Sequence, residues 1–212
     1  MIKIEKTDVF GWESAVRGMR NPMNSWEKSD STFLPVNAPP AEYVPEIGDN
    51  DLSLMKKLVK AGADHSKFMR MINVTCDITA PLYWWKEYDT YKVGTVANSC
   101  STMHKIHAKE FTLDDFSHEH LAPAVIDHLH KTIDILNLYR SFYNDIKSKS
   151  SWYQMIQLLP SSYNQKRTVQ LNYAVLRNMY HSRKNHKLDE WRTFCEWVES
   201  LPYSELITEG GN

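Results

Sequence analysis

Residues 69–85 have the sequence MRMINVTCDITAPLYWW. Apolar side chains occupy every second position in its middle part, at Ile72, Val74, Cys76 and Ile78. This spacing is typical of a strand with a buried face, and Pro81 interrupts it near its end. We predict a strand from Phe68 to Trp85 that forms a small sheet with a β-like segment at Met1 to Glu5.

Helices are expected where apolar side chains recur every three or four residues. These segments are Trp12 to Met19, Asp51 to Ala61, Ala122 to Ile146, a stretch that starts near Thr168 as its N-cap, and Leu188 to Leu201. Gly62 is placed to end the second helix as its C-cap, and a polar linker from Lys147 to Ser151 ends the third. The predicted fold class is therefore α+β, a small antiparallel or mixed sheet packed by several helices.

The length of 212 residues and the hydrophobic share of 42% suit a single domain, expected over residues 1–212. Residues 21–50 are rich in Pro, Asn and Ser, so a long irregular loop is predicted there. Lys and Arg number 25 against 26 for Asp and Glu, a net charge of −1. Such a balance excludes the global positive field that drives nucleic-acid binding.

A cytoplasmic location without a membrane partner is expected from two further features. No apolar run reaches the roughly 20 residues that cross a bilayer, and the N-terminal MIKIEKTDVF carries charges where a signal peptide is apolar.

The three cysteines, Cys76, Cys100 and Cys195, are odd in number and far apart, as expected of reduced thiols. Since no activating motif surrounds Cys100, a buried inert thiol is favoured there over a nucleophile.

Neither the dinucleotide-binding glycine fingerprint nor the P-loop occurs in this sequence. The histidine pairs are His104-x-x-His107, His118-x-His120 and His128-x-His130. Only the first pair has same-face helical spacing, so no metal site is predicted. A group of aromatic residues consists of Trp84, Trp85, Tyr88 and Tyr91. These rings either stack on a flat ligand or, as is more common, pack in the core.

The stretch from Gln154 to Lys187 contains no Asp or Glu. Its cations are Lys166, Arg167, Arg177, Arg183, Lys184 and Lys187. A helix that begins just after Arg167 would add its N-terminal amides to the same positive field, so this stretch is a candidate anion site. The alternative is a solvated basic helix face.

Several segments, in order and over nearly the whole chain, resemble the flavin-dependent thymidylate synthase family of the ThyX type. They are LMKKLVKAGADHSKF at 54–68, ITAPLYWWKEYDTYK at 78–92, and LLP at 158–160 followed by NYAVLRNMYHSR at 172–183. The resemblance implies FAD as cofactor, with NADPH and methylenetetrahydrofolate as co-substrates, and a homotetramer. It also implies sites for the flavin at Ser66, Lys92, Asn172 and Asn178, and for a pyrimidine nucleotide at Glu87, Ser101 and Arg183.

The family's signature motif is degenerate in this chain. The family has Arg-His-Arg, a Ser, and then Asn-Glu-x-Ser-x-Arg-Tyr, where this chain has Thr90-Tyr91-Lys92, Thr95 and Asn98-Ser99-Cys100-Ser101-Thr102-Met103-His104. Ala174 and Ile156 stand at two further arginine positions, and Ser182 stands at a leucine position. Each lost bidentate contact to an anion would cost about 1.5–3 kcal/mol. No catalytic residue is assigned for this reason.

Two functions follow from these comparisons of motifs. The first is a flavin- and pyrimidine-nucleotide-binding protein related to the FAD-dependent methylation of dUMP to dTMP. The second is a non-catalytic binding or regulatory subunit that keeps the same fold but has lost thymidylate synthase activity. Fold analogy by itself does not choose between them.

Overall fold

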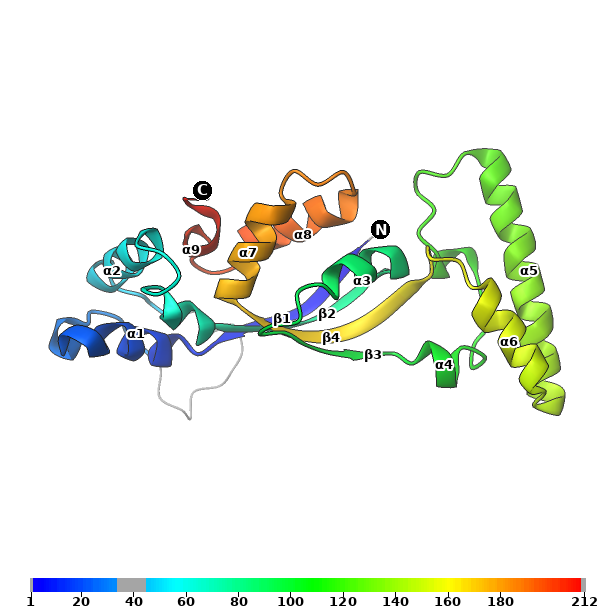
Figure 1. Ribbon diagram of the computed structural model, residues 1–212, viewed down its shortest axis with the longest axis horizontal. Helices are drawn as coiled ribbons and strands as arrows, with labels where there is room; N and C mark the ends of the chain where they lie inside the picture. The colour runs from blue at the N-terminus through cyan, green and yellow to red at the C-terminus, as the bar shows by residue number, and fades with distance from the viewer. Residues whose placement is uncertain (1, 34–44, 211–212) are drawn as a thin grey trace. The chain divides into compact units, whose positions relative to one another are not determined.

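A computed structural model describes residues 2–33 and 45–210 of the chain (Figure 1). Within these residues a four-stranded antiparallel sheet has the order β1-β2-β4-β3. Its strands are β1 (Lys3–Phe10), β2 (Asn73–Pro81), β3 (Val96–Ser99) and β4 (Asn164–Asn172). Helices pack on this sheet, so the predicted α+β class is confirmed.

The strand expected from Phe68 to Trp85 is wrong at both ends. A short 3-10 helix, η3 (Lys67–Arg70), precedes β2, and the helix α3 (Leu82–Tyr88) follows it. Pro81 lacks an N–H for the ladder and stands as the N-cap of α3, where its extended backbone leads into the helix. The rings of Trp84, Trp85 and Tyr88 are buried on that helix, which confirms that these aromatic residues serve the core.

The last third of the chain departs most from the prediction. Thr168 does not cap a helix, because it lies within β4, and its hydroxyl donates to Asp77 Oδ1 of β2 at 2.6 Å. The helix α7 (Tyr173–Arg183) begins later, with Asn172 as the N-cap. Most side chains of β4 are polar, with Val169 and Leu171 as its apolar residues, and the sheet rather than a helix pairs the backbone groups.

The chain forms two compact units. The first contains Asp77–Thr90 and Ala97–Thr168 with the start of β1, and the second contains Ile4–Cys76, Tyr91–Val96 and Val169–Asn212. The expectation of one domain over residues 1–212 stays a prediction.

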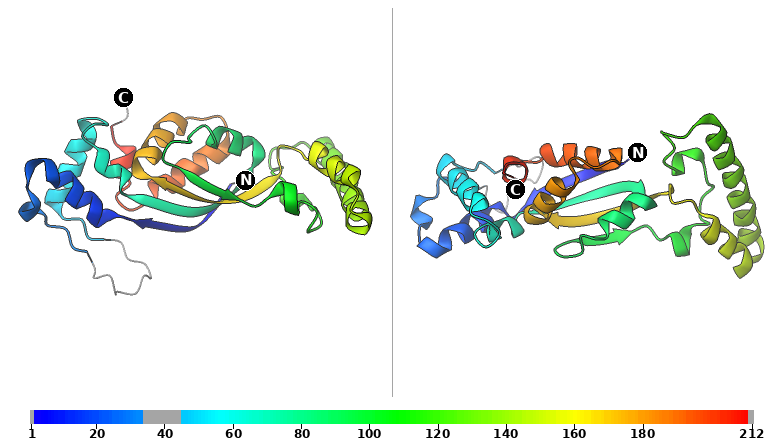
Figure 2. Two further views of the ribbon diagram at one scale, coloured as in Figure 1. Left: turned by 60° about the horizontal axis from the view of Figure 1, so that its bottom comes forward. Right: turned by 45° about the horizontal axis from the view of Figure 1, so that its top comes forward.

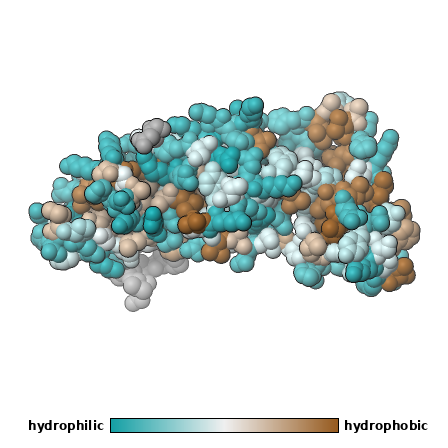
Figure 3. All heavy atoms as spheres, in the orientation of Figure 1, coloured by the Kyte–Doolittle hydropathy of each residue, from teal (hydrophilic) through white to brown (hydrophobic). Residues whose placement is uncertain are grey.

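The first unit is built around the long helix α5 (Pro123–Ile146), which confirms the helix expected over Ala122 to Ile146. Lys147 turns the chain with a left-handed backbone, φ 51°, and α6 (Lys149–Leu158) starts two residues later, so the predicted linker to Ser151 is too long. The short α4 (Thr102–Lys105) and the 3-10 helix η4 (Leu113–Asp115) complete the unit. Its core comprises Ile106, Phe111, Phe116, Leu129, Ile133, Leu136 and Met155. Apolar residues also remain on the surface of α5 and α6 (Figure 3).

The second unit contains the helices α1 (Trp12–Arg20), α2 (Asp49–Lys60), α7, α8 (Asp189–Glu199) and α9 (Glu205–Thr208). The three helices predicted over Trp12 to Met19, Asp51 to Ala61 and Leu188 to Leu201 are confirmed. Figure 2 shows α7 and α8 on one side of β1, where Trp197 Nε1 donates to Thr7 Oγ1 at 3.0 Å.

The segment expected to be a long loop, residues 21–50, begins with two 3-10 helices, η1 (Asn21–Met23) and η2 (Trp26–Lys28). Thr32 forms an isolated bridge with Glu46, and residues 34–44 of the predicted loop lie outside the described residues. In the described part of the chain, no helix combines the length and the apolar character of a membrane span.

Candidate functional site

A cavity of about 490 Å³ opens in the second unit, within the usual size range of small-molecule sites. The end of α2, the turn after it, η3, α7 and Gly210 form its wall. The polar side chains on this wall are Lys60, Ser66, Arg70, Arg177, Asn178 and His181. We call it the α2–α7 cavity.

The turn after α2 brings Ser66 to the cavity. Gly62 has φ +104°, a left-handed conformation that glycine adopts without strain, and so the chain leaves the helix there. Both the backbone N–H and the hydroxyl of Ser66 donate to the Gly62 carbonyl oxygen at 3.1 Å. These two bonds hold Ser66 at the start of η3.

One face of α7 supplies the opposite wall. Ala174, Arg177, Asn178 and His181 follow one another at steps of three, one and three residues. In an α-helix, this spacing places the side chains along one stripe. The side chain at 174 is small, so it leaves space beside the longer polar groups.

The cavity wall carries positive charge. Lys60, Arg70 and Arg177 are its fixed cations, and no Asp or Glu lines it within the described residues. Lys60 and Arg70 form no ion pair with any residue that the structure describes. A concave surface with one sign of charge raises the local concentration of oppositely charged ligands. The cavity therefore favours an anion.

Arg177 ties the C-terminal segment to this wall. Its Nη1 donates to the carbonyl oxygens of Leu206 at 3.3 Å, Ile207 at 2.9 Å and Glu209 at 2.6 Å. Its Nη2 donates to the carbonyl oxygen of Gly210. Burial lowers the pKa of Arg177 from its ordinary value. Because its partners are carbonyl groups, no carboxylate in these bonds neutralises its charge.

His181 also contacts the C-terminal segment. Its Nε2 lies 3.0 Å from the carbonyl oxygen of Ile207. Burial is the largest cause that lowers the pKa of His181, and the nearby charges of Arg177 and Lys184 lower it further, while the bond to Ile207 acts the other way. On balance these causes favour the neutral ring.

Two of the predicted flavin contacts, Ser66 and Asn178, lie together in the α2–α7 cavity. Asn172 and Lys92 belong to the same unit but do not line the cavity. The Asn172 Oδ1 accepts from Val175 N at 3.1 Å as the N-cap of α7, and its Nδ2 donates to Gly94 O at 3.5 Å. The side chain of Lys92 is exposed.

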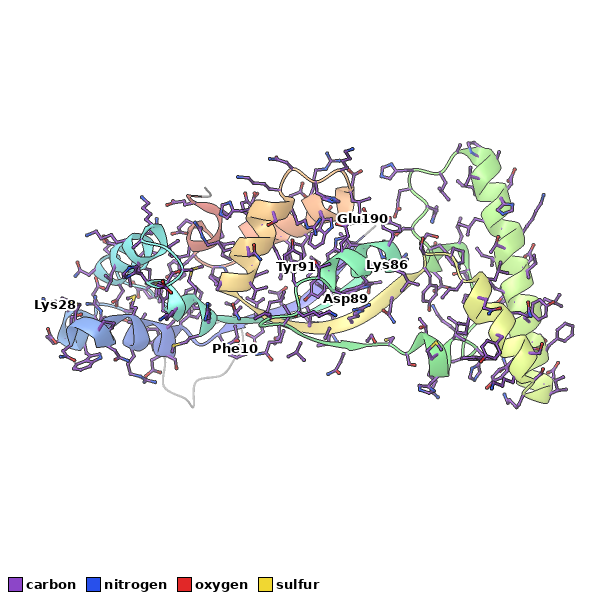
Figure 4. All side chains as sticks on the ribbon, in the orientation of Figure 1. Phe10, Lys28, Lys86, Asp89, Tyr91 and Glu190 are labelled. Carbon is purple, nitrogen blue, oxygen red and sulfur yellow. The ribbon has the colours of Figure 1, made fainter. Side chains whose placement is uncertain are left out.

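Arg183, a predicted nucleotide contact, lies at the end of α7 against aromatic rings. Its Nε donates to the hydroxyl of Tyr91 at 2.9 Å, and its guanidinium lies 4.8 Å from the ring centre of Trp191. Tyr91, labelled in Figure 4, also contacts Trp191 edge to face, with ring centres 6.2 Å apart. Arg183 therefore has partners within its own unit and does not line the cavity.

The other two predicted nucleotide contacts, Glu87 and Ser101, belong to the first unit. Ser101 caps α4 by accepting from His104 N at 3.0 Å and lines a second cavity of about 350 Å³ together with Cys100 and Tyr163. Cys100 is exposed, so the expectation of a buried thiol there is wrong. Burial is the largest cause that raises the pKa of Tyr163.

The basic stretch from Gln154 to Lys187 does not form one anion site. Arg167 lies within β4, so the helix start expected beside it is wrong, and it pairs with Asp89 at 2.7 Å and covers the ring of Trp85. Lys166 pairs with Asp77 at 3.0 Å. Acids distant in sequence thus face these two cations, and of the cations in this stretch only Arg177 reaches the α2–α7 cavity.

Three of the polar cavity residues were not predicted as candidate site residues: Lys60, Arg70 and His181. His181 stands three residues after Asn178 on α7, a spacing that could have indicated it. Lys60 ends α2 and Arg70 ends η3, and nothing in their local sequence marks them. Among the described residues, no group of three or more His, Cys, Asp or Glu is placed to hold a metal ion.

The fold is similar to that of flavin-dependent thymidylate synthases. A crystal structure of ThyX from Helicobacter pylori complexed with FAD and dUMP matches with a TM-score of 0.68 and 15% identity, over 98% of each chain. A second structure of Thymidylate Synthase X from Helicobacter pylori, with FAD and dUMP, matches with a TM-score of 0.70 and 14% identity, over 99% of this chain and 98% of the other. At these identities the likeness is one of fold. No protein-family profile and no curated protein sequence matches the chain.

Proposed function

We propose that this protein binds FAD in the α2–α7 cavity and acts together with a pyrimidine nucleotide. One observation carries the proposal: Ser66 and Asn178 meet in a cavity that also holds three cations and no carboxylate among its described lining residues. The two similar ThyX structures are complexes with FAD and dUMP.

The residues of the cavity suit a flavin nucleotide. Lys60 and Arg70 would attract its diphosphate, and the Ser66 hydroxyl and Asn178 amide would form hydrogen bonds with its polar groups. When bound, FAD supplies reversible two-electron transfer, and the protein contributes binding and orientation. Lys92 and Asn172 remain proposed flavin contacts, and Glu87, Ser101 and Arg183 remain proposed nucleotide contacts.

A titration of FAD into the purified protein, followed by flavin fluorescence, tests the proposal. Replacing Lys60 and Arg70 together by Gln removes two cations that have no ion pair in the described chain, so we expect FAD affinity to fall at least about tenfold. Lys67→Gln is the matched control, since this exposed lysine of η3 does not line the cavity. Equal FAD affinities for the double variant and the control would contradict the assigned site.

A second candidate function is a non-catalytic subunit of the same fold, and the surroundings of Arg183 favour it. Tyr91 stands at the position of the family's signature histidine, and here it accepts a hydrogen bond from Arg183. Thr90 and Met103 stand at signature arginine positions and carry no charge.

NADPH and methylenetetrahydrofolate would act as co-substrates only if activity is retained. A cytoplasmic location is part of the proposal, since the three cysteines are free.

We therefore expect little or no conversion of dUMP to dTMP when FAD, NADPH and methylenetetrahydrofolate are all supplied. Groups that stabilise developing charge on the uracil ring must be preorganised, and neutral side chains do not replace arginine in that role. Release of tritium from C5-labelled dUMP measures the reaction. Turnover near ~1 per second, within the ordinary enzyme range, would show a rebuilt active site and overturn the non-catalytic candidate.

A further inference from the structure

A third cavity opens in the first unit, at the turn that joins α5 to α6. Its volume of about 280 Å³ is close to the lower end of the range of small-molecule sites. The residues that line it come from α4, α5, the turn and α6, and they are Met103, His104, Tyr143, Lys147, Lys149 and Trp152. We call it the turn cavity. None of the residues proposed above to contact FAD or the pyrimidine nucleotide lines it.

The turn cavity carries positive charge. Lys147 and Lys149 are exposed and form no ion pair within the part of the chain that the structure describes, and no Asp or Glu is among the described lining residues. Burial is the largest cause that lowers the pKa of the neighbouring His107. The charges that lower it further are those of Lys147, Lys105 and Arg140, and all three are positive. Such a group of cations attracts an anion.

Lys147 occupies a backbone position that favours glycine. It ends α5 in the left-handed conformation, with φ 51° and ψ 32°, and its N–H donates to the carbonyl oxygen of Tyr143 at 2.8 Å. Glycine adopts this conformation without the steric cost that a side chain brings. A lysine in the last turn of α5 would offer its charge to the helix end without that cost, but that turn holds no basic residue. The position of Lys147 therefore indicates a role outside the helix.

Two half-buried aromatic rings line the turn cavity beside these cations. The Trp152 Nε1 donates to the carbonyl oxygen of Met103 at 2.9 Å, which holds the indole against α4. The ring centre of Tyr143 lies 5.2 Å from Lys147 Nζ and 4.7 Å from the ring centre of His107. Aromatic side chains held in this way offer flat apolar surface to the planar ring of a ligand.

We propose that the turn cavity binds a free nucleotide, whose phosphate interacts with Lys147 and Lys149 and whose base packs against Trp152 and Tyr143. The volume suits one nucleotide, and the net charge of −1 gives the chain no global positive field for a nucleic-acid strand. The inference goes beyond the proposed function, because the turn cavity lies in the first unit and its binding requires no FAD.

Titration calorimetry with AMP tests the proposal. We expect AMP to bind at least about tenfold more tightly than adenosine or inorganic phosphate, because only AMP engages both the rings and the lysines. Lys147→Gly and Lys149→Gln should each weaken AMP binding roughly 3- to 10-fold. Lys147→Gly should leave the melting temperature unchanged or raise it, since glycine is unstrained at this position. Lys131→Gln is the control, because this exposed lysine of α5 does not line the cavity.

The indole N–H of Trp152 reports on the site itself. In ¹⁵N-tryptophan-labelled protein, its resonance, assigned by its loss in Trp152→Phe, should shift as AMP is added. At the same AMP concentration the shift should be much smaller in the variant that combines Lys147→Gly with Lys149→Gln. The variant with Gln at both Lys60 and Arg70 should keep the full shift, because these residues line the cavity of the other unit.

Three results would overturn the assignment. The Trp152 resonance could stay in place when AMP is added, which would show that the turn cavity is not the site. Inorganic phosphate could bind as tightly as AMP, which would show an anion site that recognises no ring. A single-stranded octanucleotide could bind more tightly than AMP, which would assign the cavity to nucleic acid. Failure of the protein to bind FAD would remove the proposed function and leave this inference standing.

Discussion

At the scale of single residues, Asp51 is the most deeply buried acid among the residues that the structure describes. Its side chain is fully buried, its Oδ1 accepts from Arg20 Nε at 2.6 Å, and its Oδ2 accepts from the hydroxyls of Ser29 and Ser31. Burial opposes the charged form, but the hydroxyls of Ser31 and Ser29 and the Arg20 guanidinium outweigh it, so the pKa of Asp51 lies below its ordinary 3.8. This group of bonds anchors the segment after α1 to α2.

We predict that Asp51→Asn destabilises the protein by about 3–5 kcal/mol at pH 7, because it leaves the buried Arg20 charge without the carboxylate that neutralises it. Since the folded pKa is lowered, the stabilisation by Asp51 is complete above its unfolded pKa and is lost as the pH falls from 3.8 through the folded value. Urea unfolding at pH 7 and at pH 3 measures both effects. The exposed Asp64→Asn serves as control, and equal losses for the two variants at pH 7 would contradict the prediction.

At the scale of the element, α7 depends on its cap. We predict that Asn172→Ala lowers the free energy of unfolding by about 1 kcal/mol, because the N–H of Val175 loses its acceptor. Asn172→Ser keeps a capping oxygen and, like Ala, lacks the amide that donates to Gly94 O, so it should remain more stable than the Ala variant. Urea unfolding compares the three proteins. Equal stability of the Ala and wild-type proteins would show that the cap contributes nothing.

At the scale of the whole molecule, α5 carries a second apolar stripe beside the one in its core. Ile135, Leu138, Phe142 and Ile146 follow one another at helical spacing and are 44–73% exposed. Exposed Lys131 lies one turn before this stripe, and exposed Asp145 lies near its end. A second copy of the chain, antiparallel to the first, would bring these opposite charges together while covering the stripe. Such a pairing would supply one contact of the homotetramer that the resemblance to the ThyX family implies.

We predict that light scattering on the wild-type protein at micromolar concentration gives the mass of a tetramer. Glutamate at both Leu138 and Phe142 would place charges in the covered stripe and lower that mass. A Glu substitution at Ala124, which is exposed on α5 outside these four residues, is the control. A wild-type monomer would remove the homotetramer.

The sequence by itself determined the elements that depend on residues close together in the chain. The three- and four-residue spacing along α5 and the alternation from Ile72 to Ile78 in β2 are such patterns, and both are present in the fold. The motif segments also indicated Ser66 and Asn178, which lie in one cavity.

Only the tertiary structure decided the rest. The residues of β4 carry mixed polar and apolar side chains, and they form a strand because β2 and β3 pair with their backbone groups from both sides. The cavity likewise arises where α7 packs against η3 and α9, which brings Arg70, Arg177 and the carbonyl of Ile207 to one place. Which groups form hydrogen bonds or ion pairs in a folded protein depends on their neighbours in space. The local spacing of residues along the chain does not specify those neighbours.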